Sequence, residues 1–269
     1  MTMSDRAANL PVATGVTPER LKGLRRWNIG LAVVLLGMAG AILALTNDFA
    51  IPVLASYVDG APGSLEGGGA ESLVTFTLFN LTIGYAVTAF LALAGLDHLI
   101  TATIGRGIYE SDLKRGVNRF RWAEYSVSAT LMVIVLAMYW GIVTINALVA
   151  VAGANIAMIL FGYLQERMNP PGRTTTTMVP FWFGSLVGIM PWIAMSINIP
   201  LYSDAPQYIF VTLGVQGVLF FCFGLNQWLQ YTGVGRWKDY AFGEKCYLVL
   251  SMTAKSLLAW QVFVVSLIE

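Results

Sequence analysis

Seven long apolar stretches dominate the chain, and each is close to the length that one helix needs to cross a lipid bilayer. They run over residues 28–46, 73–104, 125–145, 147–164, 178–199, 208–229 and 246–268. A bilayer core requires about 20 apolar residues per helix. The stretches are continuous rather than short and alternating, which excludes a transmembrane β-barrel. We therefore predict an all-α membrane protein, a seven-transmembrane-helix bundle, with a bend at Pro191 in the fifth helix.

The composition excludes several other classes of protein. Only 12% of the 269 residues are charged, about half of what soluble domains carry. The net charge of +1 provides no basic field for binding nucleic acid. Cys222 and Cys246 both lie in apolar stretches, so a disulfide scaffold is excluded. With a single histidine in the chain, we expect no metal site.

The loop charges orient the predicted bundle. Fifteen of the 16 Lys and Arg residues fall in residues 1–27 and in every second loop, whereas the remaining loops are acidic. The positive-inside rule then puts the N-terminus in the cytoplasm and the C-terminus outside. We expect a multi-pass protein of a prokaryotic plasma membrane, with a cytoplasmic tail over 1–27, the bundle over 28–269 and a long extracellular loop over 47–72. The acidic residues of the outer loops are Asp48, Asp59, Glu66, Glu71 and Asp204.

The sixteenth cation, Lys255, lies in the middle of the seventh stretch. A charge at that depth costs about 2.5–3.5 kcal/mol on insertion scales. Two explanations fit the sequence. Lys255 is either a structural partner of a buried carboxylate or a desolvated amine that forms a Schiff base. Ser251 lies one helical turn earlier on the same face, where it can hydrogen-bond the lysine nitrogen.

The depth of Lys255 in the membrane favours Glu124 as its partner. Asp97 and Glu124 are the acidic candidates, and Glu124 lies roughly 30 Å from the outer end of its helix at 1.5 Å per residue. Lys255 lies roughly 20 Å from the outer end of the seventh helix. Its side chain leans toward the cytoplasmic end, because helical side chains tilt toward their own N-terminus. An ion pair between Lys255 and Glu124 is therefore expected.

Further polar residues gather in the same half of the bundle. Three- and four-residue spacing puts a polar stripe beside the carboxylate, made of Asn118, Arg121, Glu124, Tyr125 and Ser128. Asp97 and His98 lie in the cytoplasmic half of the second stretch. His98 is either a packed core residue or a proton acceptor, and its place among these ionisable groups favours the second interpretation.

Several segments of the chain resemble one family of retinal proteins. These are RRWN before the first stretch, RWAEYSVSA around Glu124, FFCFGLNQWLQY in the sixth stretch and SMTAK at Lys255, followed by Trp260. Together with the cytoplasmic N-terminus, they resemble the heliorhodopsins over essentially the whole chain. Other microbial rhodopsins have the N-terminus outside and usually an aspartate at the counterion position.

The resemblance implies a role for each of these residues. Lys255 would bind all-trans retinal as a protonated Schiff base, Glu124 would be its counterion, and Ser251 would hydrogen-bond it. The retinal pocket would include Tyr125, Ser128, Met158, Ile159, Gly162, Phe220, Gly224, Gln227 and Trp260, with Gly162 leaving room for the polyene. A cytoplasmic proton network would consist of His98, Asp97, Tyr109, Asn118, Arg121 and Tyr125. The first stretch has no histidine, which leaves Glu124 and His98 as the nearby proton acceptors.

The expected function is light sensing and signalling rather than pumping or enzymatic catalysis. A pump needs ionisable groups on both sides of the Schiff base, and here they all lie on the inner side. The alternatives are a light-driven or light-gated proton conductance and, from another class, a retinal-free membrane carrier or enzyme. The expected partners are membrane lipid, an unidentified cytoplasmic signalling protein and, from the resemblance, a second copy in a homodimer.

Overall fold

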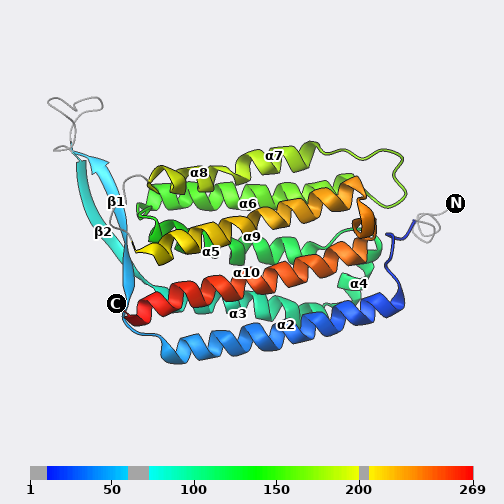
Figure 1. Cartoon of the computed structure of the whole chain (residues 1–269), viewed down its shortest axis with the longest axis horizontal. Coiled ribbons are helices and arrows are strands. Elements are labelled where there is room, and N and C mark those ends of the chain that lie inside the picture. The colour runs from blue at the N-terminus through cyan, green and yellow to red at the C-terminus, as the bar shows by residue number, and fades with distance from the viewer. Residues whose placement is uncertain (1–10, 60–72, 200–205, 269) are drawn as a thin grey trace.

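The computed structural model describes residues 11–59, 73–199 and 206–268, which fold into a helical bundle with a β-hairpin at one end (Figure 1). The described part of the chain has seven helical segments that are long and apolar enough to cross a membrane, so the predicted number of spans is confirmed. They are α2 (Pro18–Leu45), α3 (Ile83–Ala102), α5 (Arg119–Tyr139), α6 (Ile145–Met168), α7 (Val179–Gly188) with α8 (Met190–Ile197), α9 (Gln207–Thr232) and α10 (Tyr240–Ile268).

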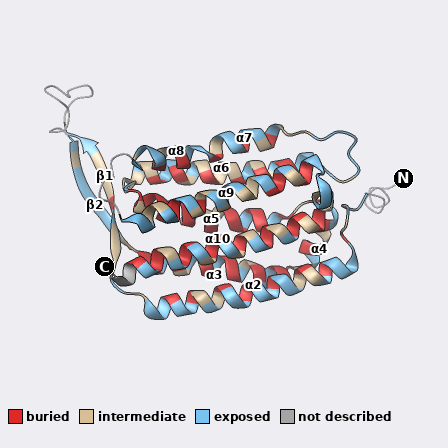
Figure 2. Cartoon of the chain, in the orientation of Figure 1, coloured by how far each residue is buried: buried red, intermediate tan, exposed pale blue. Residues whose placement is uncertain are grey.

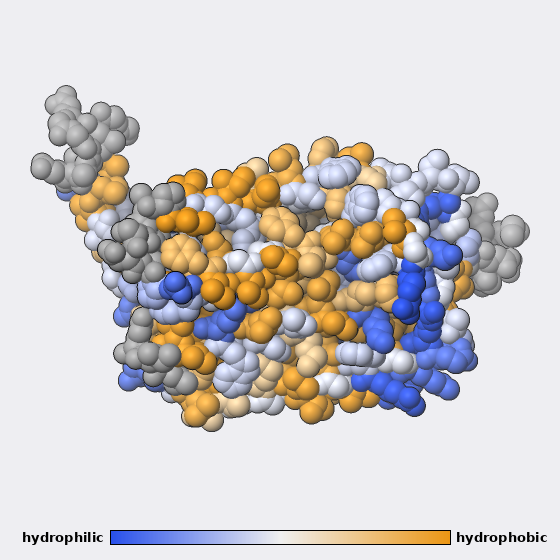
Figure 3. Space-filling model, in the orientation of Figure 1, coloured by the Kyte–Doolittle hydropathy of each residue, from blue (hydrophilic) through white to orange (hydrophobic). Residues whose placement is uncertain are grey.

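The two ends of the bundle differ in chemistry. The short helices α4 (Arg106–Lys114) and η2 (Gly235–Lys238) lie at the end where the described N-terminal segment begins. We call this the cationic end, because the loops there carry most of the lysines and arginines. Figure 3 shows hydrophilic residues gathered there and an apolar surface over the middle of the bundle. The opposite end, which carries the strands, is called the hairpin end.

The first spanning helix begins within the segment predicted as an N-terminal tail. Helix α2 begins at Pro18 rather than at residue 28, and the Thr17 hydroxyl caps it by accepting from the Arg20 amide at 3.4 Å. Residues 1–10 of the predicted tail lie outside the described residues. The Ala13 amide donates to the Lys114 carbonyl at 2.8 Å, and the Tyr240 amide donates to the Thr14 carbonyl at 2.9 Å. The segment therefore ties α2 to α4 and α10.

The start predicted for the second span, residue 73, is wrong. Residues 73–82 form strand β2 (Leu73–Thr82), which pairs antiparallel with β1 (Ala50–Val58). The segment LVTFTLFNLT is rich in β-branched and aromatic residues, which favour a strand. The Leu54 amide donates to the Val143 carbonyl at 2.9 Å and so anchors the hairpin to the α5–α6 loop. The rest of the predicted loop, 60–72 with Glu66 and Glu71, lies outside the described residues, as does Asp204.

The interior of the hairpin half is filled with large apolar side chains. Phe90 of α3, Leu136 of α5 and Phe263 of α10 are almost completely buried there. Figure 2 shows buried residues along the inward faces of these helices. The fifth span is broken between α7 and α8, and Pro191 lies in the first turn of α8, as the predicted bend requires. The buried polar groups of this half are uncharged, such as Gln216 of α9, which donates to Gln261 of α10 at 3.1 Å. The buried charged side chains lie at Lys255 and in the cationic half.

Candidate functional site

Lys255 of α10 is buried within the bundle, and its amine faces a carboxylate. Its side chain is 3% exposed, and Nζ lies 3.2 Å from Glu124 Oε1 of α5. Nζ also donates to Ser251 Oγ at 2.7 Å, one turn earlier on the same helix. The structure thus brings together the three residues that the sequence places at the centre of the site. A buried charge needs such a partner, because removing it from water without compensation is very costly.

The immediate neighbours of this ion pair hold it in place. Ser128, one turn after Glu124, donates its hydroxyl to Glu124 Oε1. The ring of Tyr125 lies beneath the amine, with 4.8 Å between Lys255 Nζ and the ring centroid, close enough for a cation–π interaction. Ser128 therefore orients the carboxylate, while the face of the Tyr125 ring contacts the amine.

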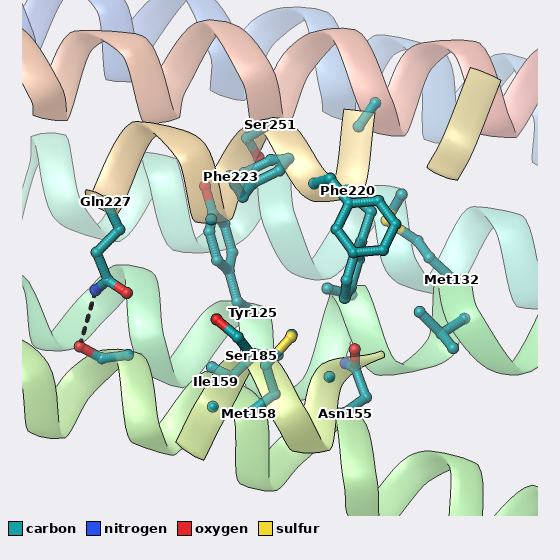
Figure 4. A pocket seen from close by; sticks show the side chains of 18 of the residues that line it. Tyr125, Met132, Asn155, Met158, Ile159, Ser185, Phe220, Phe223, Gln227 and Ser251 are labelled. Atoms are coloured by element: carbon teal, nitrogen blue, oxygen red, sulfur yellow. Dashed lines mark hydrogen bonds between the residues drawn. The ribbon is translucent and has the colours of Figure 1, made fainter. Parts of the chain in front are cut away.

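A cavity of about 190 Å³ extends from Lys255 between α5, α6, the α7–α8 pair and α9. Figure 4 shows Phe220 and Phe223 of α9 on one side of this space and Met158 and Ile159 of α6 on the other. The lining is almost entirely apolar and aromatic. Of the predicted pocket residues, those on its wall are Tyr125, Met158, Ile159, Gly162, Phe220, Gly224, Gln227 and Ser251.

Two glycines on the cavity wall serve different purposes. A Cβ added at Gly162 would lie 2.5 Å from the Trp122 ring, whereas one added at Gly224 meets no described atom within 4 Å. The missing side chain of Gly162 thus makes room for the Trp122 ring, which lines the same cavity. That Gly162 also leaves room for a polyene, as the resemblance implies, stays a prediction. The Gly162 carbonyl accepts from Gln227 Nε2 at 3.1 Å, the dashed line in Figure 4.

The structure does not place Trp260 and Ser128 on the wall of this cavity. Trp260 is 40% exposed, and its ring contacts that of Phe263. Five residues of α-helix turn the chain by roughly 140° beyond one full rotation, so Trp260 faces away from Lys255. Ser128 is buried, but its hydroxyl serves Glu124 instead.

A second, much smaller cavity of about 20 Å³ lies on the cationic side of the ion pair. Most of its lining residues are polar or charged, and they include the whole predicted network, namely Asp97, His98, Tyr109, Asn118, Arg121 and Tyr125, together with Glu124. Burial raises the pKa of the Tyr109 hydroxyl, so this group of α4 stays neutral. Asn28 and Glu244, which the sequence did not single out, also line the cavity.

Arg121 pairs with two carboxylates other than Glu124. Its guanidinium donates to Glu166 of α6 and to Glu244 of α10, and all three side chains are buried. We call these three residues the Arg121 cluster. Trp122 Nε1 donates to Glu166 Oε2 at 2.5 Å, and Asn118 Nδ2 donates to Glu244 Oε2 at 2.8 Å. The cluster therefore locks α5, α6 and α10 together at the cationic end.

The sequence analysis did not single out Glu166 or Glu244, and the reason differs between the two. The sequence prediction ends the fourth span at residue 164, which leaves Glu166 in a loop, whereas α6 continues to Met168. Glu244 precedes Lys255 by eleven residues, which returns it to nearly the same helix face. That spacing is a signal from which Glu244 could have been found. No group of His, Cys, Asp and Glu in the described ranges is arranged to hold a metal ion.

Comparison with known proteins identifies the family. The family model described as heliorhodopsin matches residues 24–267. The chain belongs to the heliorhodopsin family. Among solved structures, this heliorhodopsin is similar to cyanorhodopsin from the cyanobacterium Tolypothrix sp. NIES-4075, with 14% identity and a TM-score of 0.63 over 92% of this chain and 94% of that one. It is also similar to the light-driven proton pump rhodopsin of Coccomyxa subellipsoidea, with 13% identity and a TM-score of 0.60 over 93% and 98% of the two chains.

At these identities the two structural matches show that the fold is that of the microbial rhodopsins. No curated protein matches the chain. Membership of the family implies a retinal chromophore, and the site of this heliorhodopsin fits one. It offers a buried primary amine, a carboxylate 3.2 Å away to balance a cation, and an aromatic-lined apolar cavity that begins at Lys255.

Proposed function

We propose that this heliorhodopsin is a light-sensing photoreceptor that signals through a local proton movement. All-trans retinal, bound to Lys255 as a protonated Schiff base, would supply light absorption and isomerisation. The observation that carries the proposal is the position of the Lys255 amine, which is buried at the end of the apolar cavity and faces Glu124. An amine in that position is both accessible from the cavity and paired with a carboxylate.

Three side chains control the charge on the Lys255 nitrogen. The Glu124 carboxylate neutralises it from 3.2 Å, and attraction between opposite charges is strong in a medium of low dielectric constant. Ser251 accepts a hydrogen bond from the nitrogen. Ser128 donates to Glu124 and keeps its carboxylate oriented. These three side chains would set the charge on the nitrogen of a bound chromophore, and a change in that buried charge would bias the bundle toward a second conformation.

The hairpin half of the bundle supports sensing over pumping. A transmembrane proton path needs ionisable or wetted groups on both sides of Lys255. The described helices contain no Asp, Glu, His, Lys or Arg between the level of Lys255 and the hairpin end. That interior holds large apolar side chains such as Phe90 and Phe263, and its polar pair Gln216–Gln261 is uncharged. A proton released from Lys255 therefore moves within the cationic half and returns. A light-driven pH change across proteoliposomes would overturn this part of the proposal in favour of a proton conductance.

We also infer that the cationic end faces the cytoplasm, as the distribution of Lys and Arg requires. This orientation presents α4, η2 and the N-terminal segment to a cytoplasmic signalling partner. The test is an epitope tag at the N-terminus. We expect an antibody to bind it only after the cells are permeabilised, and binding to intact cells would reverse the orientation.

The first experiment is a visible absorption spectrum of protein produced with all-trans retinal. We expect a visible band in the wild type, its complete loss in Lys255→Ala, and its retention in Lys245→Ala. Lys245 is the matched control because it lies on the same helix but is exposed, with its amine 5.2 Å from the Trp27 ring. The absence of a band from all three proteins would refute the photoreceptor proposal and favour a retinal-free carrier.

A further inference from the structure

The only histidine of the chain makes one hydrogen bond whose direction can be worked out. His98 of α3 is buried, and its Nδ1 lies 2.7 Å from Asn28 Oδ1 of α2. Asn28 Nδ2 lies 2.9 Å from the Leu24 carbonyl oxygen. A backbone carbonyl can only accept, so the atom facing it must be the amide NH₂ group, and Oδ1 must face the imidazole. Oδ1 can only accept as well, so the hydrogen in this contact belongs to His98 Nδ1.

This assignment leaves the other ring nitrogen as an acceptor. A neutral imidazole carries one hydrogen, so a proton on Nδ1 leaves a free lone pair on Nε2. Nε2 is buried and has no hydrogen-bond partner within 11–59, 73–199 and 206–268. Buried polar atoms of this kind usually have a partner, and an exception calls for an explanation.

The small polar cavity provides that explanation. His98 lines it together with Glu124, and the cavity volume of about 20 Å³ is enough for one water molecule. Because Nδ1 is hydrogen-bonded to Asn28, Nε2 is the His98 nitrogen that remains free to accept a hydrogen bond or a proton from the cavity. The charged or titratable groups around this space are Asp97, Tyr109, Arg121, Glu124, Tyr125, Glu244 and Tyr247, with Lys255 beyond Glu124. A proton that leaves the Lys255 nitrogen on this side thus meets a ready acceptor.

We propose that Asn28 is a positioning residue that holds His98 in the tautomer with hydrogen on Nδ1, so that Nε2 receives the proton that leaves Lys255 after illumination. This inference rests on the proposed function. In the transfer, the bond from the Lys255 nitrogen to the proton breaks and a bond from His98 Nε2 to the proton forms. The ring becomes an imidazolium beside the Glu124 carboxylate, and the same proton returns in the dark. Asn28 Oδ1 accepts from Nδ1 in both states, so this contact needs no rearrangement.

The test compares Asn28→Leu, which removes the acceptor, with Asn28→Asp, which keeps an oxygen at the same position. Solid-state ¹⁵N NMR of the imidazole reads the tautomer, and a chain with a single histidine gives one pair of ring signals. We expect hydrogen on Nδ1 in the wild type and in Asn28→Asp, and a shift of hydrogen toward Nε2 in Asn28→Leu. Wild-type protein with the hydrogen on Nε2 would overturn the inference. This measurement needs no chromophore, so it remains decisive even if no pigment forms.

Flash photolysis of the retinal-loaded protein tests the consequence. We expect the deprotonation step to slow about tenfold in Asn28→Leu, as the loss of one hydrogen bond predicts, and to recover in Asn28→Asp. In a His98→Phe background, Asn28→Leu should add no further slowing, since both changes act through one group. Unchanged kinetics in a pigmented Asn28→Leu protein would refute the inference alone, whereas failure of every variant to form pigment would refute the proposed function.

Discussion

The bundle contains two buried ionic sites, which share helices α5 and α10 but have different roles. In the Lys255–Glu124 pair, one cation from α10 meets one carboxylate from α5, with 3.2 Å between the charged atoms and a cavity beside them. In the Arg121 cluster, one cation from α5 meets two carboxylates, from α6 and α10. The guanidinium is also stacked between two rings, 4.6 Å from the Trp122 centroid and 3.9 Å from that of Tyr247.

The difference lies in how far each site is satisfied. Glu166 accepts hydrogen bonds from the Arg121 guanidinium, the Trp122 indole, the backbone amide of Asn118 and the Tyr240 hydroxyl. Lys255 has two hydrogen-bonding partners, of which Ser251 is the closer. Although Arg121 Nε has no hydrogen-bond partner in the described structure, the cluster is densely bonded through its carboxylates, which fixes the helices in place. The amine of Lys255, with two partners beside a cavity, remains available for chemistry. Burial of a charge alone does not distinguish the two roles.

The largest effect on stability is expected from Arg121→Met. Removing one partner from a buried ion pair costs about 3–5 kcal/mol, and here two carboxylates lose their cation. Thermal unfolding in detergent measures the loss. Arg115→Met is the control, because the exposed side chain of Arg115 hydrogen-bonds only Ser111 in the described structure. It should change stability by less than about 0.5 kcal/mol. Lys255→Met should abolish the visible band but reduce stability by less than Arg121→Met, because it leaves only one buried carboxylate without its cation. Equal unfolding temperatures for Arg121→Met and Arg115→Met would contradict the comparison.

Glu124→Gln probes the other site through the absorption spectrum. We expect the visible band to shift to the red, because loss of the anion 3.2 Å from the Lys255 nitrogen destabilises the ground state, in which the positive charge sits near that nitrogen. Glu110→Gln is the control, as Glu110 of α4 pairs only with Arg106 among the described residues, at 2.6 Å. An unshifted band would remove Glu124 from the role of counterion.

Gly162→Ala tests whether the cavity wall and the Arg121 cluster are connected. The new Cβ would lie 2.5 Å from the Trp122 ring, and overpacking of this kind costs about 1–3 kcal/mol. Gly224→Ala is the matched change on the same cavity wall, where no described atom lies within 4 Å. It should be neutral or slightly stabilising, because alanine favours helix over glycine by about 0.5–1 kcal/mol. Equal unfolding temperatures for the two variants would show that the Trp122 ring moves freely.

The smallest effect is expected from Ser251→Ala. It removes the 2.7 Å hydrogen bond to Lys255 but leaves the ion pair with Glu124 in place. The band should shift by less than in Glu124→Gln. Ser256→Ala, on the same helix and bonded to Met38 Sδ at 3.5 Å, should leave the spectrum unchanged. A larger shift from Ser251→Ala than from Glu124→Gln would mean that the hydroxyl, rather than the carboxylate, dominates the environment of the nitrogen.

Features that depend on local sequence could be predicted, whereas contacts between distant segments could not. Helix length and hydropathy indicated seven spans, and the depth argument brought Lys255 and Glu124 together across 131 residues. The partners of Arg121 depend on how α5, α6 and α10 pack, which no spacing within one helix reveals. The same holds for Asn28, which meets His98 only because α2 lies against α3.

Two errors show the limits of hydropathy and of spacing. Strand β2 is apolar enough to pass as the start of a span, although Val74, Thr75, Phe76 and Thr77 already favoured a strand. Trp260 was assigned to the pocket because it follows Lys255 in the segment that resembles the heliorhodopsins, although the helical period turns it away from Lys255. For β2 the type of the side chains was the more informative signal, and for Trp260 it was their periodicity along the helix.

The position of Trp122 has a consequence for how the colour of such a pigment can change during evolution. Its ring forms part of the cavity wall, while its indole nitrogen donates to Glu166 in the Arg121 cluster. A substitution that reshapes the wall at Trp122 or at Gly162 therefore also disturbs the contacts that hold three helices together. Tuning through this part of the wall is constrained by stability, whereas the open space beside Gly224 leaves room for variants that alter absorption without that penalty.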